Sequence, residues 1–180
     1  MSNIIAVIGA TGVGKTHFIK ERYLVGVRKI YKVDPFPHYV TRNHVIFGRY
    51  APEHTAMNEG TDSMQSKMAP IEIASVAIGL FERYKKDVVI DGHMIMQRQT
   101  LLYLHVVSRL EVIHLHCSLK VAMQHLKVRG STQNFWRVHA QLKNAVNLAR
   151  YAKENGISVK SINTGDVYEN GSSSREPMFV

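Results

Sequence analysis

Residues 2–17 of the chain read Ser-Asn-Ile-Ile-Ala-Val-Ile-Gly-Ala-Thr-Gly-Val-Gly-Lys-Thr-His. The apolar run Ile4–Ile8 is typical of a buried strand, and it leads directly into a glycine-rich segment. Residues 9–16 satisfy the pattern G-x-x-x-x-G-K-[ST], in which backbone N–H groups surround a phosphate. Residues 17–23 can continue as a helix. This order of strand, loop and helix predicts a phosphate-binding loop formed by Gly9, Ala10, Thr11, Gly12, Val13, Gly14, Lys15 and Thr16.

Each residue type in this loop has a chemical reason. Several N–H donors must converge on a polyphosphate without side chains in the way, and glycines permit that approach and the positive φ values of the curve. Lys15 opens the helix, so its ammonium can reach the β- and γ-phosphates beside the partial positive charge of the helix N-terminus. Thr16 places a hydroxyl where Mg²⁺ lies in such sites. The sequence therefore predicts binding of ATP or GTP with Mg²⁺.

Composition predicts one compact domain. Hydrophobic residues make up 45% of the 180 residues, which is enough to build a core. Strand-like runs alternate with helical patterns at 70–86, 97–109, 119–128 and 134–154, which indicates the α/β class. We expect the domain to span residues 1–168 and a flexible tail to occupy 169–180. No apolar run reaches membrane-spanning length and no signal peptide is evident, so we expect a cytoplasmic protein.

Charge is the first compositional signal with functional content. The chain has 23 Lys and Arg against 14 Asp and Glu, a formal net charge of +9, which predicts attraction to polyanions. Between residues 112 and 153 there is no acid, while seven Lys and Arg occur. Two interpretations stay open: a basic face that binds nucleic acid, or substrate-phosphate ligands together with ordinary solvated surface.

Two aspartates follow predicted strands. In open α/β sheets ligands bind beyond the carboxyl ends of the strands, so an acid there can reach a substrate. Asp34 follows the strand expected at 27–33 and is a candidate general base, or else a turn residue before proline. Asp91 ends the apolar run 87–91 and is a candidate to hold Mg²⁺ or orient the nucleophile, or else it caps the next helix.

Three further residues lie where a phosphate-transferring enzyme would bind its acceptor. Arg49, Tyr50 and Asp62 belong to a polar, glycine-containing segment after the strand expected at 44–47, which can also be a surface loop.

The junction between the last two helices carries Arg129 and Arg137. Arg129 is a candidate to neutralise charge during phosphoryl transfer, or else it compensates a helix C-terminus; Arg137 is a candidate substrate ligand.

The histidines and the cysteine are better explained by packing. His114 and His116 alternate with apolar residues, so they share one face of a strand, and no nearby Cys or carboxylate completes a metal-binding set. The single cysteine, Cys117, lies in the same apolar run and is interpreted as a small core residue. His93 has no acid within sequence reach, so we assign it no catalytic role.

The combination of the loop at 9–16, the strand ending at Asp91-Gly92, and a later strand followed by a helix that ends at Arg129-Gly130 resembles the nucleoside and nucleotide kinase group of phosphate-loop proteins. The resemblance covers residues up to about 165. It implies a three-layer fold with a mostly parallel five-stranded sheet, with ATP and Mg²⁺ held by Lys15 and Thr16. It also implies that Asp34 matches the strand-exit base of polynucleotide-kinase-like members, and Arg129 a lid arginine.

A closer resemblance is to the small bacteriophage kinases that phosphorylate 5-hydroxymethyluracil within DNA. It rests on Phe47-Gly48-Arg49-Tyr50 followed by Gly60-Thr61-Asp62, and it implies DNA as a partner and a host-cytoplasmic location. The chain lacks the long arginine-rich lid insertion and the D-R-[YHS] triplet of deoxynucleoside and thymidylate kinases. It also lacks the D-x-x-G and N-K-x-D strings of guanine-nucleotide switches, which favours adenine.

The sequence thus predicts an ATP-dependent kinase that transfers the γ-phosphate to a hydroxyl of a nucleic-acid component, with a hydroxymethylated pyrimidine in DNA as the first choice. Three alternatives stay open. They are a kinase of free nucleosides or nucleotides, a nucleic-acid-stimulated ATPase, and a nucleotide-binding regulatory module without turnover.

Overall fold

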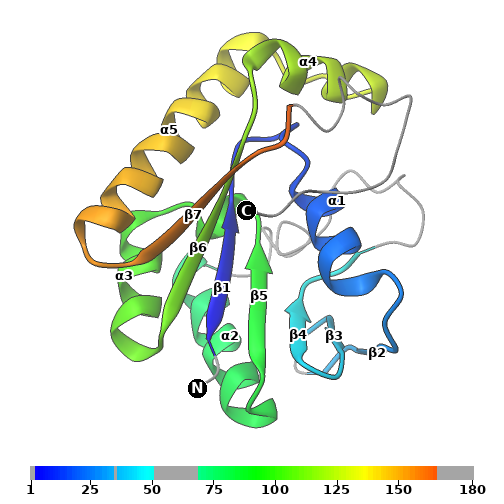
Figure 1. Ribbon diagram of the computed structural model, residues 1–180, viewed down its shortest axis with the longest axis vertical. Coiled ribbons are helices and arrows are strands. Elements are labelled where there is room, and N and C mark those ends of the chain that lie inside the picture. Colours follow the sequence, from blue (N-terminus) through cyan, green and yellow to red (C-terminus); the bar gives the residue numbers. More distant parts are fainter. Residues whose placement is uncertain (1–2, 35, 51–68, 166–180) are drawn as a thin grey trace.

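The computed structural model describes residues 3–34, 36–50 and 69–165, and a seven-stranded mixed sheet forms their centre (Figure 1). The strands lie in the order β2-β3-β4-β5-β1-β6-β7. Five neighbouring strands pair in parallel with one another: β4 (His44–Phe47), β5 (Asp87–Asp91), β1 (Ile4–Ile8), β6 (Leu110–His116) and β7 (Ser158–Asn163). All five point their carboxyl ends at the same edge of the sheet.

The sheet has two more strands than the sequence predicted. β2 (Ile30–Lys32) and β3 (His38–Val40) extend the sheet beyond β4 through antiparallel pairing, so the sheet has seven strands and not five. The strand expected at 27–33 is limited to the three residues of β2. Each of the two strands has only three residues, which is too short to show a periodic pattern in the sequence. The predicted α/β class and the mostly parallel, helix-flanked sheet are confirmed.

The helices follow the predicted segments closely. α2 (Pro70–Tyr84), α3 (Arg98–Val107), α4 (Leu119–Val128) and α5 (Phe135–Glu154) occupy the four segments that the apolar periodicity indicated. Ser118 and Asn134 cap α4 and α5, since their side-chain oxygens accept bonds from the N–H groups of Val121 and Arg137. α1 (Lys15–Ile19) continues as the π-helical turn η1 (Lys20–Leu24), and the short 3-10 helix η3 (His93–Ile95) follows β5.

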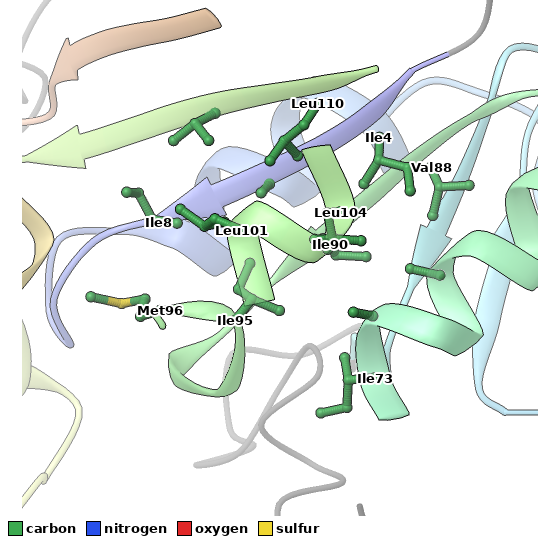
Figure 2. Packing of buried hydrophobic residues seen from close by; sticks show 14 of the residues in the cluster. Ile4, Ile8, Ile73, Val88, Ile90, Ile95, Met96, Leu101, Leu104 and Leu110 are labelled. Carbon is green, nitrogen blue, oxygen red and sulfur yellow. The ribbon is translucent and has the colours of Figure 1, made fainter. Parts of the chain in front are cut away.

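Alternate residues of the buried strands face two hydrophobic layers. Ile4 and Ile8 of β1 face α2, α3 and α5, and Figure 2 shows them with the side chains of Ile90, Leu101 and other members of that layer. The opposite face of β1, with Ile5 and Val7, packs against α1 and η1. β1 is therefore covered on both faces, and this explains why its sequence is an unbroken apolar run. The expected three-layer arrangement is confirmed.

The central place of β1 sets the position of the phosphate-binding loop. β5 and β6 pair with β1 on either side, so the loop that follows Ile8 lies between the carboxyl ends of these two neighbours. Figure 1 shows α4 above this loop, with α5 descending along the sheet. Among the described helices, none combines the length and apolarity needed to cross a lipid bilayer.

Candidate phosphate-transfer site

Glycines allow the loop between β1 and α1 to pack tightly against its neighbours. Gly12 and Gly14 both have a φ of 89°, a value that favours glycine. A Cβ atom on Gly12 would lie 2.6 Å from the carbonyl oxygen of Ala122 in α4, and one on Gly9 would lie 2.6 Å from that of Leu115 in β6. The glycine spacing therefore meets a packing requirement as well as a conformational one.

Lys15 curls back over the loop. Its Nζ donates to the carbonyl oxygens of Gly9 and Ala10 at 2.9 and 3.0 Å. Lys15 and Thr16 are the first two residues of α1, so the ammonium and the hydroxyl both lie at the helix N-terminus, where backbone N–H groups point outward. This end of α1 therefore combines a cation, a hydroxyl and oriented N–H groups, which is the chemistry that a polyphosphate requires.

Three side chains from distant segments hold the loop in place. The ring Nδ1 of His125 lies 2.7 Å from the carbonyl oxygen of Gly12, and Gln141 Oε1 accepts a bond from the N–H of Thr11 at 3.1 Å. Thr164 Oγ1 donates to the carbonyl oxygen of Val13 at 2.8 Å. Sequence reasoning missed His125, Gln141 and Thr164, because they are more than 100 residues from their partners and carry no local pattern.

Asp91 lies next to the loop. It ends β5 and is paired with Val7, two residues before the loop begins at Gly9. The Asp91 side chain is 2% exposed, and its Oδ1 accepts a bond from the Tyr50 hydroxyl at 2.5 Å. Tyr50 itself is buried. The sequence indicated that Tyr50 binds the acceptor, and in the structure its hydroxyl contacts the carboxylate of Asp91.

Asp34 lies elsewhere. It follows the edge strand β2, and four strand spacings separate β2 from β1, a distance of about 19 Å across the sheet. Its carboxylate is 91% exposed and 3.9 Å from the guanidinium of Arg83 at the end of α2. Of the two strand-exit aspartates, only Asp91 is beside the phosphate-binding loop.

The other candidate residues are divided between the site's surroundings and the outer surface. Arg129 is exposed at the C-terminal end of α4, and its N–H bonds to the carbonyl of His125, whose ring contacts the loop. Arg137 is exposed in the first turn of α5, and Arg49 is exposed between the end of β4 and Tyr50. Asp62 lies outside the described residues.

The donor set fits Mg²⁺. Thr16 and Asp91 offer a hydroxyl and a carboxylate, which are hard oxygen ligands, on the two sides of the loop. Within the residues that the structure describes, no cluster of three or more His, Cys, Asp and Glu could hold a metal ion. The rings of His114 and His116 lie 5.4 Å apart, and His114 is buried, as expected for a histidine that packs.

Burial changes the ionisation of two nearby groups. It raises the pKa of the Cys117 thiol, which keeps the sulfur protonated, although Cys117 is half-buried rather than fully buried as predicted. Burial and the nearby His116 and Lys153 lower the pKa of His114 to about 4, so its imidazole is neutral at pH 7. Neither group has the reactive form that a nucleophile or a cationic ligand requires.

No protein-family model matches the chain. No curated protein matches it either. Among solved structures, it is similar to deoxyadenosine kinase from M. mycoides with products dCMP and dCDP bound, with 16% identity, 89% of this chain and 90% of that chain covered, and a TM-score of 0.43. It is also similar to the tunicamycin resistance protein of Deinococcus radiodurans, with 14% identity, 88% and 98% covered, and a TM-score of 0.44. The deoxyadenosine kinase with bound dATP gives 17% identity, 89% and 90% covered, and a TM-score of 0.43.

Proposed function

We propose that this chain is an ATP-dependent kinase that transfers the γ-phosphate to a hydroxyl of a nucleic-acid component. One observation carries the proposal: the loop of residues 9–16 joins β1 to the N-terminus of α1, and buried Asp91 ends the strand paired with β1. Phosphate-binding N–H groups, the Lys15 ammonium and a carboxylate thus share one edge of the sheet. This is the constellation that phosphoryl transfer needs, since catalysis there depends mainly on positioning and charge neutralisation.

The residues have distinct roles in this proposal. The loop N–H groups and Lys15 bind the β- and γ-phosphates, and Arg129 approaches them from the end of α4. Thr16 would hold Mg²⁺, with Asp91 as a ligand through water, and the ion would supply further neutralisation of phosphate charge. As the acceptor oxygen bonds to the γ-phosphorus, the bond to the bridging oxygen of ATP breaks and ADP leaves. The proton of the acceptor hydroxyl passes to a carboxylate, and the position of Asp91 beside the loop favours it over Asp34.

For the acceptor we propose a hydroxymethylated pyrimidine, 5-hydroxymethyluracil first, in DNA. The net charge of +9 supports a polyanionic substrate, which a kinase of free nucleosides does not need. The exposed Arg49 and Arg137 are available to contact acceptor phosphates. Tyr50 acts in this proposal through Asp91, because its hydroxyl is already bonded to that carboxylate.

The test uses γ-labelled ATP and Mg²⁺ with three acceptors in parallel: ordinary duplex DNA, duplex DNA that contains hydroxymethylated pyrimidines, and a panel of free nucleosides and nucleotides. We expect label in hydroxymethylated DNA alone. Label only in a free nucleoside or nucleotide would retain the kinase and overturn the DNA acceptor. Release of free phosphate at a rate that DNA raises, with no labelled acceptor, would assign an ATPase instead.

Substitutions of Asp34 and Asp91 test which of the two aspartates takes part in phosphoryl transfer. We expect Asp91→Asn to lower the transfer rate by at least 100-fold, since it removes the carboxylate beside the loop, and Asp34→Asn to change it far less. Lys15→Ala should abolish transfer. Equal losses in Asp34→Asn and Asp91→Asn would restore Asp34 as a catalytic candidate and place the acceptor toward the β2 edge of the sheet.

A further inference from the structure

The long helix α5 carries a stripe of mostly exposed side chains, with aromatic rings at its start, the half-buried His139 and the aliphatic Val146 along it, and cations toward its end. The stripe runs along one side of the helix, because its members are separated by three or four residues. The opposite side of α5 is buried in the core through Ala145, Leu148 and Ala152. The α5 stripe consists of Phe135, His139, Lys143, Val146, Arg150 and Lys153.

An exposed tryptophan extends the aromatic end of the stripe. The side chain of Trp136 is 74% exposed and that of Phe135 is 47% exposed, and their ring centroids lie 5.3 Å apart in an edge-on arrangement. Large exposed aromatic side chains cost solvation energy, so their presence together at a helix start points to a flat apolar ligand. Five residues further along α5 than Trp136, Gln141 bonds to Thr11 of the phosphate-binding loop.

The cationic end of the stripe borders a hollow surface. Lys143, Asn147 and Arg150 line a groove of about 500 Å³ together with His114 and His116 of β6. A neighbouring groove of about 400 Å³ shares Arg150 and both histidines and adds Lys153 and Ser161. No carboxylate is among the described residues that line either groove. The Lys and Arg side chains that line the two grooves are Lys143, Arg150 and Lys153.

The dimensions favour a strand over a compact anion. The three cations span about 15 Å along α5, so they cannot converge on a single phosphate group. From Phe135 to Lys153 the stripe measures about 27 Å, which equals about eight nucleotides at the rise of one stacked strand. A series of phosphates with stackable bases meets both ends of the stripe, whereas a phosphorylated peptide offers no regular series of flat rings.

We infer that the α5 stripe and its grooves bind single-stranded nucleic acid, with Phe135 and Trp136 stacking on bases and Lys143, Arg150 and Lys153 contacting phosphates. The inference rests on the proposed function only for its purpose, which is to hold an unpaired segment of the DNA that carries the acceptor hydroxyl. Binding itself requires neither ATP nor transfer, so it can be measured separately.

Trp136 provides a direct readout because it is the only tryptophan of the chain. We expect a twelve-nucleotide single strand, titrated into the full chain without ATP, to quench its emission, because bases that stack on indole quench it. An abasic strand with the same number of phosphates should bind without this quenching. Equal quenching by both strands, or none by either, would overturn the stacking assignment.

Matched charge variants test the phosphate contacts. The triple variant Lys143→Gln, Arg150→Gln and Lys153→Gln should lower affinity at least tenfold at low salt and reduce the slope of log K against log salt by about two. The control Arg28→Gln, Lys32→Gln and Arg42→Gln places the same loss of three charges on exposed residues at the other end of the sheet. Thermal unfolding checks that both variants fold. Equal loss of affinity in the two variants would show that net charge alone attracts the strand and would overturn the site.

The two proposals fail in different ways. Binding of the strand with quenching of Trp136, together with label in none of the acceptors, would remove the kinase assignment and retain this site. Transfer to a free nucleoside by a chain that does not bind the strand would retain the kinase and remove the site.

Discussion

At the scale of single residues, the candidate site depends on a few buried polar contacts. Asp91 is almost completely removed from water, and a buried carboxylate requires hydrogen-bond donors to remain stable in the fold. The hydroxyl of Tyr50 is one such donor. The Tyr50 contact therefore links the end of β4 to the strand exit that faces the phosphate-binding loop.

The variant Tyr50→Phe tests that link. Loss of one donor to a buried carboxylate should lower the free energy of unfolding by about 1–3 kcal/mol and lower the rate of phosphoryl transfer. Urea unfolding and the labelled-ATP assay measure the two effects. Tyr103→Phe is the control, because the Tyr103 side chain is 36% exposed and its change should cost less than about 0.5 kcal/mol. Wild-type stability and rate in Tyr50→Phe would exclude a positioning role.

His114 should make stability depend on pH. Its pKa is about 4 in the folded chain and 6.5 ordinarily, so the unfolded chain binds more protons between these values and stability falls as pH decreases through that window. This histidine should contribute a loss of about 2 kcal/mol between pH 7 and pH 5.

The variant His114→Leu should therefore lose less stability than the wild-type chain over the same pH range, as measured by urea unfolding at pH 7, 6 and 5. His93→Gln is the control, because it replaces an exposed histidine that lies outside β6. An unchanged pH dependence in His114→Leu would contradict the depressed pKa.

At the scale of elements, α4 and the phosphate-binding loop are packed backbone to backbone at Gly12. Any side chain there must displace Ala122 or the loop, and the φ of 89° adds strain for every residue other than glycine. The orientation of α4, and with it the position of Arg129, is thus coupled to the loop of residues 9–16.

The variant Gly12→Ala should lower the free energy of unfolding by about 1–3 kcal/mol and weaken ATP binding. Gly79→Ala is the opposite case. Gly79 lies exposed inside α2 with open space around its Cα, so alanine should raise stability by about 0.5–1 kcal/mol. Urea unfolding of both variants measures the contrast. A destabilised Gly79→Ala, or a Gly12→Ala as stable as the wild-type chain, would contradict the packing.

The elements themselves were largely predictable. α4 and α5 have the expected bounds because apolar periodicity and the capping residues Ser118 and Asn134 are local signals. β3 was missed because three residues carry no period, and its existence depends on pairing with β2 and β4. Short strands of this kind are decided by partners that the local sequence does not reveal.

At the scale of the whole molecule, ligand binding should stabilise the fold through the loop between β1 and α1. At ATP and Mg²⁺ concentrations near 100 times the dissociation constant, the gain is about 2.7 kcal/mol, which raises the unfolding temperature by roughly 5–10 °C. We expect Lys15→Ala to lose this shift and Lys32→Ala, on the edge strand β2, to keep it. A full shift in Lys15→Ala would contradict the assignment of the loop.

Local signals in the amino-acid sequence were enough to predict the glycine-rich loop of residues 9–16, the α/β class and the main helices. Their signals lie in consecutive or helically spaced residues, and the chemistry of Gly9, Lys15 and Thr16 is complete within one short segment. Only the tertiary structure decided that Asp91 and not Asp34 lies beside that loop, and that Tyr50 bonds to Asp91. It also decided that His125 and Gln141 hold the loop and that Lys143 and Arg150 of α5 line a groove with His114 and His116 of β6. The physical reason is that these relations depend on strand order and helix orientation, which arise from packing between segments far apart in the chain.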